Sequence, residues 1–263
     1  MTKEDIDASE APLIEHLIEL RKRLMICAVG FVLAFVFSFI FSSEILTYLL
    51  LPFKWGTGLA DFKLISIKLL GVFLVKIKIA FFGGMFIAFP LMAVQIYRFV
   101  APGLYSHEKN AFRPYLMATP VFFLLGAALV YFFLLPTAIH FFYALAASTG
   151  GPGQTAIELM PDIEAYLDFV MMLILAFGLC FQLPVVLTLL GQIGIVSYDQ
   201  LRSGRKFAIV GVFVIAAVLT PPDPISQISM AIPLMGLYEV SVQAVRFLEA
   251  RRKKAEAAKD AAA

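Results

Sequence analysis

Charge is scarce in this chain of 263 residues, and it is missing from the middle of the long apolar stretches. Asp, Glu, Lys and Arg make up 15% of the residues, hydrophobic residues make up 61%, and the mean hydropathy is +0.89. A soluble core of this length needs far less apolar surface. The composition therefore predicts an integral membrane protein, and the net charge of only +2 gives no reason to expect a nucleic-acid partner.

Cysteine and histidine are also few, which removes most metal and redox chemistry. The two cysteines, Cys27 and Cys180, lie inside apolar stretches, where such residues are typically small hydrophobes. The three histidines are far apart and lack the His-Glu-x-x-His spacing of a metal hydrolase. The sequence also lacks a phosphate-binding glycine loop, a nucleophile elbow and a paired-cysteine zinc motif. We therefore expect no metal, no cofactor and no enzymatic activity.

Apolar stretches long enough to cross a bilayer dominate what remains. A spanning helix needs about 20 mainly apolar residues, and the prediction is an all-α membrane protein with six such helices. Four spans are clear from length: Met25–Phe41, Ile79–Tyr97, Leu116–Leu135 and Phe169–Leu190.

The last two predicted spans, Phe207–Leu219 and Ile225–Val240, are short. A proline-rich turn, which includes Pro221, Pro222 and Asp223, separates them and cannot continue a helix. At 1.5 Å per residue the first reaches only about 20 Å against a hydrocarbon core of about 30 Å. They either cross a locally thinned bilayer or form a re-entrant hairpin, and both arrangements return the chain to the same side.

Basic residues are divided unequally between the two sides of such a bundle. With six crossings, 16 of the 21 Lys and Arg residues fall on the side of both termini and five fall on the other side, namely Lys54, Lys63, Lys68, Lys76 and Lys78. The positive-inside rule then places the N- and C-termini in the cytoplasm. We predict a single polytopic domain over 1–263: a cytoplasmic amphipathic helix (1–24), a six-span bundle (25–240) and a cytoplasmic basic tail (241–263). Pro52 lies in the segment that connects the first two spans.

Two glutamates stand where apolar stretches meet basic residues. Leucines at 13, 17, 20 and 24 mark one face of the helix before the first span, and Glu19 lies on another face. Pro102 and Gly103 end the second span, so that Glu108 falls in the first turn of the next helix. Two interpretations stay open, because Glu19 can be an ordinary partner of Arg23 and Glu108 an ordinary first-turn acid, or both can bind a ligand.

Three motifs in this order resemble the TatC family, the multispanning receptor subunit of the twin-arginine, or Sec-independent, protein translocase. They are His16-Leu-Ile-Glu-Leu-Arg-Lys-Arg-Leu24, Phe99-Val-Ala-Pro-Gly-Leu-Tyr-Ser-His-Glu-Lys109 and Leu219-Thr-Pro-Pro-Asp223. The resemblance implies a bacterial inner-membrane protein that binds the signal peptides of folded cargo and recruits the single-span subunits TatA and TatB. Such a chain works with the proton-motive force, and it is expected to self-associate because one small subunit cannot enclose a folded domain.

The resemblance also implies roles for particular residues. The carboxylates at the family's positions of Glu19 and Glu108 take up the two arginines. Two carboxylates suit two guanidinium groups, because each can accept a bidentate pair of bonds that lysine cannot offer. Such a site must be partly shielded from water, and its predicted neighbours are Leu20, Arg21, Phe99 and Tyr105.

Gln182 departs from the family pattern, which commonly has a glutamate at this place in the fourth span. An amide still donates and accepts hydrogen bonds, so docking of a partner helix at Phe181, Gln182 and Pro184 stays a hypothesis beside simple internal packing. The alternative function is a secondary transporter or channel for a small solute. That alternative predicts ionisable groups at mid-depth, and the sequence has none there.

Overall fold

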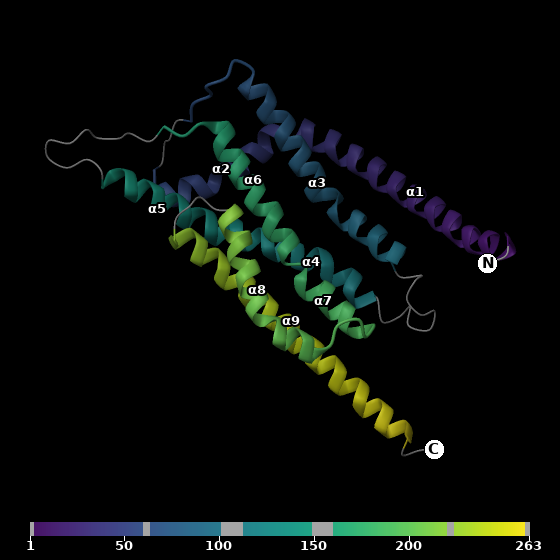
Figure 1. Cartoon of the computed structure of the whole chain (residues 1–263). Coiled ribbons are helices and arrows are strands. Elements are labelled where there is room, and N and C mark those ends of the chain that lie inside the picture. The colour runs from purple at the N-terminus through teal and green to yellow at the C-terminus, as the bar shows by residue number, and fades with distance from the viewer. Residues whose placement is uncertain (1–2, 60–63, 101–112, 149–159, 220–223, 261–263) are drawn as a thin grey trace. The chain divides into compact units, whose positions relative to one another are not determined.

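The computed structural model describes residues 3–59, 64–100, 113–148, 160–219 and 224–260, and these residues are almost entirely helical (Figure 1). The only β-type pairing among them is one isolated parallel bridge between Ile65 and Asp162. The helices are α1 (Lys3–Ile40), α2 (Ser42–Thr57), α3 (Gly71–Val100), α4 (Arg113–Leu129), the π-helix η2 (Val130–Leu134), α5 (Leu135–Ala147), α6 (Ile163–Cys180), α7 (Leu183–Gln192), α8 (Tyr198–Leu219) and α9 (Pro224–Asp260).

Within the described ranges, five helical segments are long and apolar enough to cross a membrane: His16–Ile40, Gly71–Phe99, Pro114–Ala147, Ile163–Gln192 and Gln227–Arg252. They contain four of the predicted spans almost entirely and most of Ile225–Val240. α8 does not reach the same length of apolar sequence, because three basic residues precede its run at 207–219. The sequence had predicted this shortness. The amphipathic helix expected before the first span is continuous with that span, since both belong to α1.

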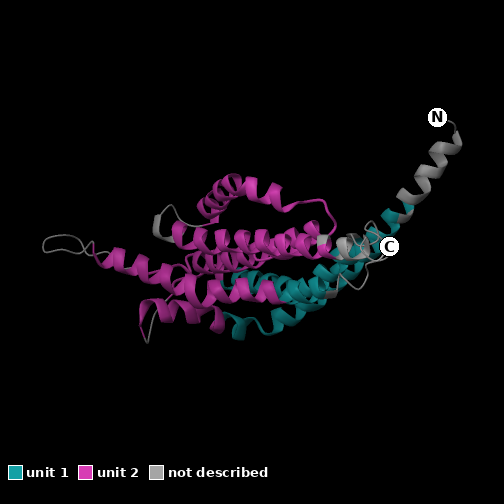
Figure 2. Ribbon diagram, turned by 90° about the horizontal axis from the view of Figure 1, so that it is seen from below, with its two compact units in different colours: residues 1–46, 72–120 teal, residues 47–71, 121–263 magenta. Residues whose placement is uncertain are grey.

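The chain divides into two compact units, which Figure 2 shows in teal and magenta. Unit 1 contains residues 1–46 and 72–120, and unit 2 contains residues 47–71 and 121–263. The divisions fall inside α2, directly after the first residue of α3, and inside α4.

In unit 1, α1 and α3 run antiparallel and side by side (Figure 1). Phe31 of α1 meets Phe81 of α3 edge to face, with ring centroids 5.2 Å apart. Gly83 and Gly84 allow this approach: a Cβ atom at Gly84 would lie 2.9 Å from the Cα of Phe35. Small residues that let two backbones approach closely are the usual contact between membrane helices.

In unit 2, the segment that carries Pro52 is helical where a connecting loop was expected. Ser42 and Glu44 begin α2 and Lys54 lies in its last turn, which suits the helix dipole. Pro52 cannot donate to the carbonyl of Tyr48 four residues earlier. The hydroxyl of Tyr131 donates to that carbonyl over 2.6 Å instead. A contact from a distant helix therefore makes the proline tolerable, and sequence periodicity gave no sign of it.

The third span is longer than predicted. α4, η2 and α5 follow one another without a break, so that helix continues to Ala147 through residues expected in a loop. The backbone N–H of Leu135 bonds to Val130, five residues earlier, which is the π-type spacing. A Cβ atom at Gly56 of α2 would lie 2.7 Å from the Cβ of Ile139, so α5 packs closely on α2 within unit 2.

The fourth span is broken in its middle. α6 ends at Cys180, α7 begins at Leu183, and Phe181 and Gln182 form the junction. Pro184 explains the break, because its ring and missing N–H prevent the helix from running through. Later in unit 2, α9 packs along both α7 and α8. Val245 of α9 fills the space beside Gly191 of α7. A Cβ atom added at Gly191 would lie 2.8 Å from a methyl carbon of Val245.

Candidate functional site

The candidate site in unit 1 is built around Glu19 on α1. Both Nε and Nη2 of Arg23, one helical turn later, donate to Oε1 of this carboxylate, the Nε bond over 2.9 Å. The side chains are partly shielded, with 33% of Glu19 and 19% of Arg23 exposed. The Glu19–Arg23 pair that the sequence indicated is therefore present, and it is less hydrated than a pair on a fully exposed helix.

Two contacts from α3 hold this part of α1. Nη1 of Arg23 donates to Oε1 of Gln95, which is buried, over 3.3 Å. One turn further along α3, the ring of Phe99 stacks on His16 with centroids 4.2 Å apart and 20° between the planes. Arg23 is thus held by one partner on its own helix and another on α3. The sequence pattern indicated Phe99 but neither Gln95 nor the stacking role of His16, because both contacts join residues over 70 positions apart.

Of the other residues predicted to lie near Glu19, the structure describes Leu20 and Arg21 only. Leu20 is 42% exposed and Arg21 is also exposed. Glu108, Tyr105 and Pro102 lie outside the described residues, as do Pro221, Pro222 and Asp223. The pairing of Glu19 with Glu108 therefore stays a prediction.

The predicted partner-docking residues lie at the break in the fourth span. The side-chain amide of Gln182 donates to the backbone carbonyl of Gly178 over 3.3 Å, and the backbone carbonyl of Gln182 accepts from the backbone N–H of Val186. Phe181 and Pro184 are buried. The amide of Gln182 thus bonds to the last turn of α6 within its own span, and any role in docking is a proposal.

A buried carboxylate that the sequence did not indicate lies in unit 2. Glu164, in the first turn of α6, is 3% exposed, and its Oε2 accepts from Nζ of Lys68 over 2.7 Å. Its Oε1 has no hydrogen-bond partner among the described residues. The backbone of Ile65 pairs with Pro161 and Ile163 on either side of Asp162, which caps α6 by accepting from Ala165. Lys68 and Glu164 therefore fasten the segment before α3 to the start of α6.

Alkaline pH is expected to weaken this attachment. The hydrogen bond and negative charge of Glu164 raise the pKa of Lys68 above its ordinary value of 10.5. Protonated Lys68 therefore stabilises the folded state fully below its unfolded-state pKa of about 10.5. This contribution to folding stability is lost as the pH rises through the higher pKa of the folded state. The thermal midpoint between about pH 9 and pH 11.5 should fall more steeply for the unchanged chain than for Lys68→Arg, because arginine stays charged there. Equal slopes would contradict the role of Lys68.

Comparison with known proteins decides the family. The family model "Sec-independent protein translocase protein (TatC)" matches residues 15–233. This chain belongs to the TatC family. The TatC protein of Magnetococcus marinus is 43% identical over 252 residues, covering 96% of this chain and 90% of that protein. The TatC protein of Escherichia coli K12 is 35% identical over 245 residues, covering 93% and 92%.

Solved TatC structures confirm the predicted fold class. A crystal structure of the twin-arginine translocase receptor TatC matches with a TM-score of 0.75 at 36% identity, covering 89% of this chain and 99% of that one. A second, in the detergent DDM, gives 0.76 at 37% identity, covering 86% and 97%. The predictions of an all-α protein with six transmembrane helices and of the TatC family are both confirmed. The chain is a multispanning component of a bacterial twin-arginine translocase.

Proposed function

We propose that this TatC-family chain is the receptor for twin-arginine signal peptides and that Glu19 and Glu108 bind the two guanidinium groups. The observation that supports this proposal is that Glu19 already binds a guanidinium group, that of Arg23, in a partly shielded position. An arginine of a peptide presents the same planar donor group. The geometry that accepts Arg23 therefore suits the proposed ligand.

An incoming arginine has two routes to Glu19. Arg23 uses Oε1, and the described residues provide no partner for Oε2, which a second guanidinium can approach. Alternatively the peptide displaces Arg23 from the carboxylate. Gln95 then retains Arg23 through Nη1, so that its charge is not left without a hydrogen-bond acceptor. The displacement route keeps the recognition reversible, since one charge-assisted bond replaces another.

The proposal includes the arrangement in the membrane and the partners. We place both termini on the cytoplasmic side of the bacterial inner membrane, because 16 of 21 basic residues fall there in a six-span arrangement. The two units then form one polytopic membrane domain. TatA and TatB are the proposed single-span partners, with Phe181, Gln182 and Pro184 as the docking position, and several copies associate around the cargo. The chain acts by binding and assembly and not as an enzyme.

A comparison of two peptides tests the receptor function directly. The full chain is reconstituted in nanodiscs and titrated with labelled signal peptides that carry Arg-Arg or Lys-Lys and are otherwise identical. Fluorescence anisotropy should show about tenfold or greater preference for Arg-Arg, because lysine cannot form the bidentate bonds. Equal affinity for the two peptides would contradict the proposal and leave the site with a nonspecific attraction for positive charge.

A further inference from the structure

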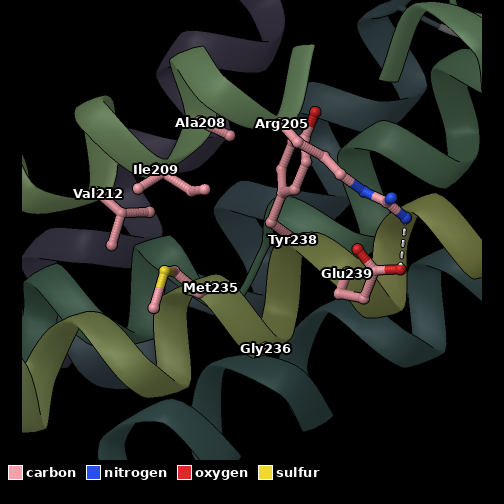
Figure 3. A pocket seen from close by; sticks show the side chains of 8 residues that line it. All are labelled: Arg205, Ala208, Ile209, Val212, Met235, Gly236, Tyr238 and Glu239. Carbon is pink, nitrogen blue, oxygen red and sulfur yellow. Dashed lines mark hydrogen bonds and ion pairs between the residues drawn. The ribbon is translucent and has the colours of Figure 1, made fainter. Parts of the chain in front are cut away.

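A groove between α8 and α9 has not been given any role above. Its volume is about 330 Å³, and its apolar floor is formed by Ala208, Ile209 and Val212 of α8 with Met235 and Gly236 of α9 (Figure 3). Gly236 leaves the space open, since a Cβ atom there would meet nothing within 4 Å. The volume lies at the lower end of the range of about 300 to 1,000 Å³ typical of small-molecule sites, which suits a slender ligand.

One end of the groove is charged. Nη2 of Arg205 donates to Oε1 of Glu239 over 2.7 Å, and Figure 3 shows these two lining side chains pointing toward one another. The Nε atom of Arg205 is buried and has no hydrogen-bond partner in the described part of the chain. A guanidinium group has five donors in one plane, so Arg205 can hold Glu239 and still donate to an anionic oxygen. The apolar floor therefore ends at a donor that lacks an acceptor.

The surrounding charge favours an anion at this end. Arg202 and Lys206 are exposed and lie within one turn of Arg205, so this turn of α8 carries three cations, of which Arg205 pairs with Glu239. The apolar run of α8 begins directly after Lys206 and contains the groove residues 208, 209 and 212. Charged donors followed by an apolar floor reproduce the order of headgroup and acyl chain in a membrane lipid.

We propose that this groove binds an anionic phospholipid, with its phosphodiester at Arg205 and one acyl chain along the floor beside Gly236. Basic pockets between transmembrane helices are known to hold anionic headgroups. The phosphodiester would then lie directly before the 13-residue apolar run of α8, at the level of Arg205. The occupant differs from the signal peptide proposed above, and its site lies in unit 2, whereas Glu19 lies in unit 1.

Native mass spectrometry of the full chain, released from detergent, provides the first test. The protein is titrated with phosphatidylglycerol or with phosphatidylcholine of the same acyl chains. We expect one phosphatidylglycerol to bind about tenfold more tightly than phosphatidylcholine, because only the anionic lipid gains from the excess of cations. Equal binding of the two lipids would overturn the proposal.

Matched variants locate the bound lipid. Gly236→Leu fills the groove and should remove the preference for phosphatidylglycerol, whereas Gly211→Leu places the same side chain in open space outside it and should preserve the preference. The double variant Arg205→Gln with Glu239→Gln should also remove the preference without leaving a lone charge. Equal effects of the two leucine variants would show that the lipid binds elsewhere.

Two further measurements distinguish a bound lipid from free phosphate and from a protein helix. Inorganic phosphate should not displace the lipid at concentrations similar to those of the lipid, and efficient displacement would assign the site to free phosphate. A benzophenone amino acid in place of Ile209, which already carries a large side chain in the groove lining, should crosslink to lipid in nanodiscs that also contain the single-span partner subunits. Crosslinking to a partner subunit, or to a second copy of this chain, would show that a protein helix fills the groove and would overturn the lipid assignment.

Discussion

Glu19→Gln is expected to lower the affinity for an Arg-Arg signal peptide by about 10- to 100-fold. Charge-assisted hydrogen bonds are worth about 1.5 to 3 kcal/mol, and the amide keeps the shape of the side chain while it loses the charge. Affinity is measured by fluorescence anisotropy on the full chain in nanodiscs. Glu108→Gln should also lower this affinity. If both carboxylates bind one peptide, the fold-loss of affinity in the double variant should be smaller than the product of the two single-variant fold-losses.

Two controls distinguish binding from a merely structural role of Glu19. Glu44→Gln removes an exposed carboxylate from the first turn of α2 and should leave affinity unchanged. Arg23→Gln removes the competing guanidinium and should raise the affinity for a Lys-Lys peptide, which narrows the discrimination between the two peptides. If Glu19→Gln lowers the thermal midpoint and leaves peptide binding intact, Glu19 only ties α1 to Arg23 and the receptor assignment fails.

Gly126→Ala is expected to destabilise the protein, although alanine favours helices. A Cβ atom at Gly126 of α4 would lie 2.7 Å from the backbone oxygen of Phe177 and 2.8 Å from the ring of Phe181. Backbone atoms of α6 cannot turn away as a flexible side chain can, so the two helices must separate. Overpacking of this kind costs about 1 to 3 kcal/mol and should lower the thermal midpoint by roughly 3 to 10 °C, measured by calorimetry in detergent.

The matched control for that prediction is Gly211→Ala on α8. A Cβ atom there meets nothing within 4 Å, and Gly211 is also helical. Alanine is favoured over glycine in a helix by up to about 1 kcal/mol, so this variant should leave the midpoint unchanged or raise it slightly. A fall of similar size in both variants would show that loss of glycine, and not contact with α6, sets the stability.

Apolar length and the distribution of charge were enough to predict most of the membrane architecture. Hydrocarbon thickness fixes the length of a span, so that Met25–Phe41 and Ile79–Tyr97 could be recognised without any neighbour. The shortness of the α8 apolar run followed from the same count, because Lys206 stands directly before it. The contact between Glu19 and Arg23 was predictable as well, since residues four apart share one face of a helix.

Contacts between distant segments were not predictable. The bond from Arg23 to Gln95 crosses 72 positions and that from Lys68 to Glu164 crosses 96, and no local pattern links these residues. Nothing in the sequence pattern indicated that Glu164 is buried, yet folding places it against Lys68. α2 was missed for a related reason, because the hydroxyl that offsets its internal proline comes from Tyr131, 83 positions away.

The π-helical turn at Val130–Leu134 sets the rotational phase of everything that follows it in the same long helix. A π turn accommodates one residue more than an α turn, and each residue of an α-helix turns the chain by about 100°. Removal of one residue from this turn would swing Tyr143 away from Phe53, which its ring meets edge to face at 5.7 Å, and would take Ile139 off Gly56. The extra residue of the π turn therefore acts as an insertion that keeps α5 in register with α2. Its loss would misalign the contacts of Tyr143 and Ile139 with α2 and would leave the span apolar.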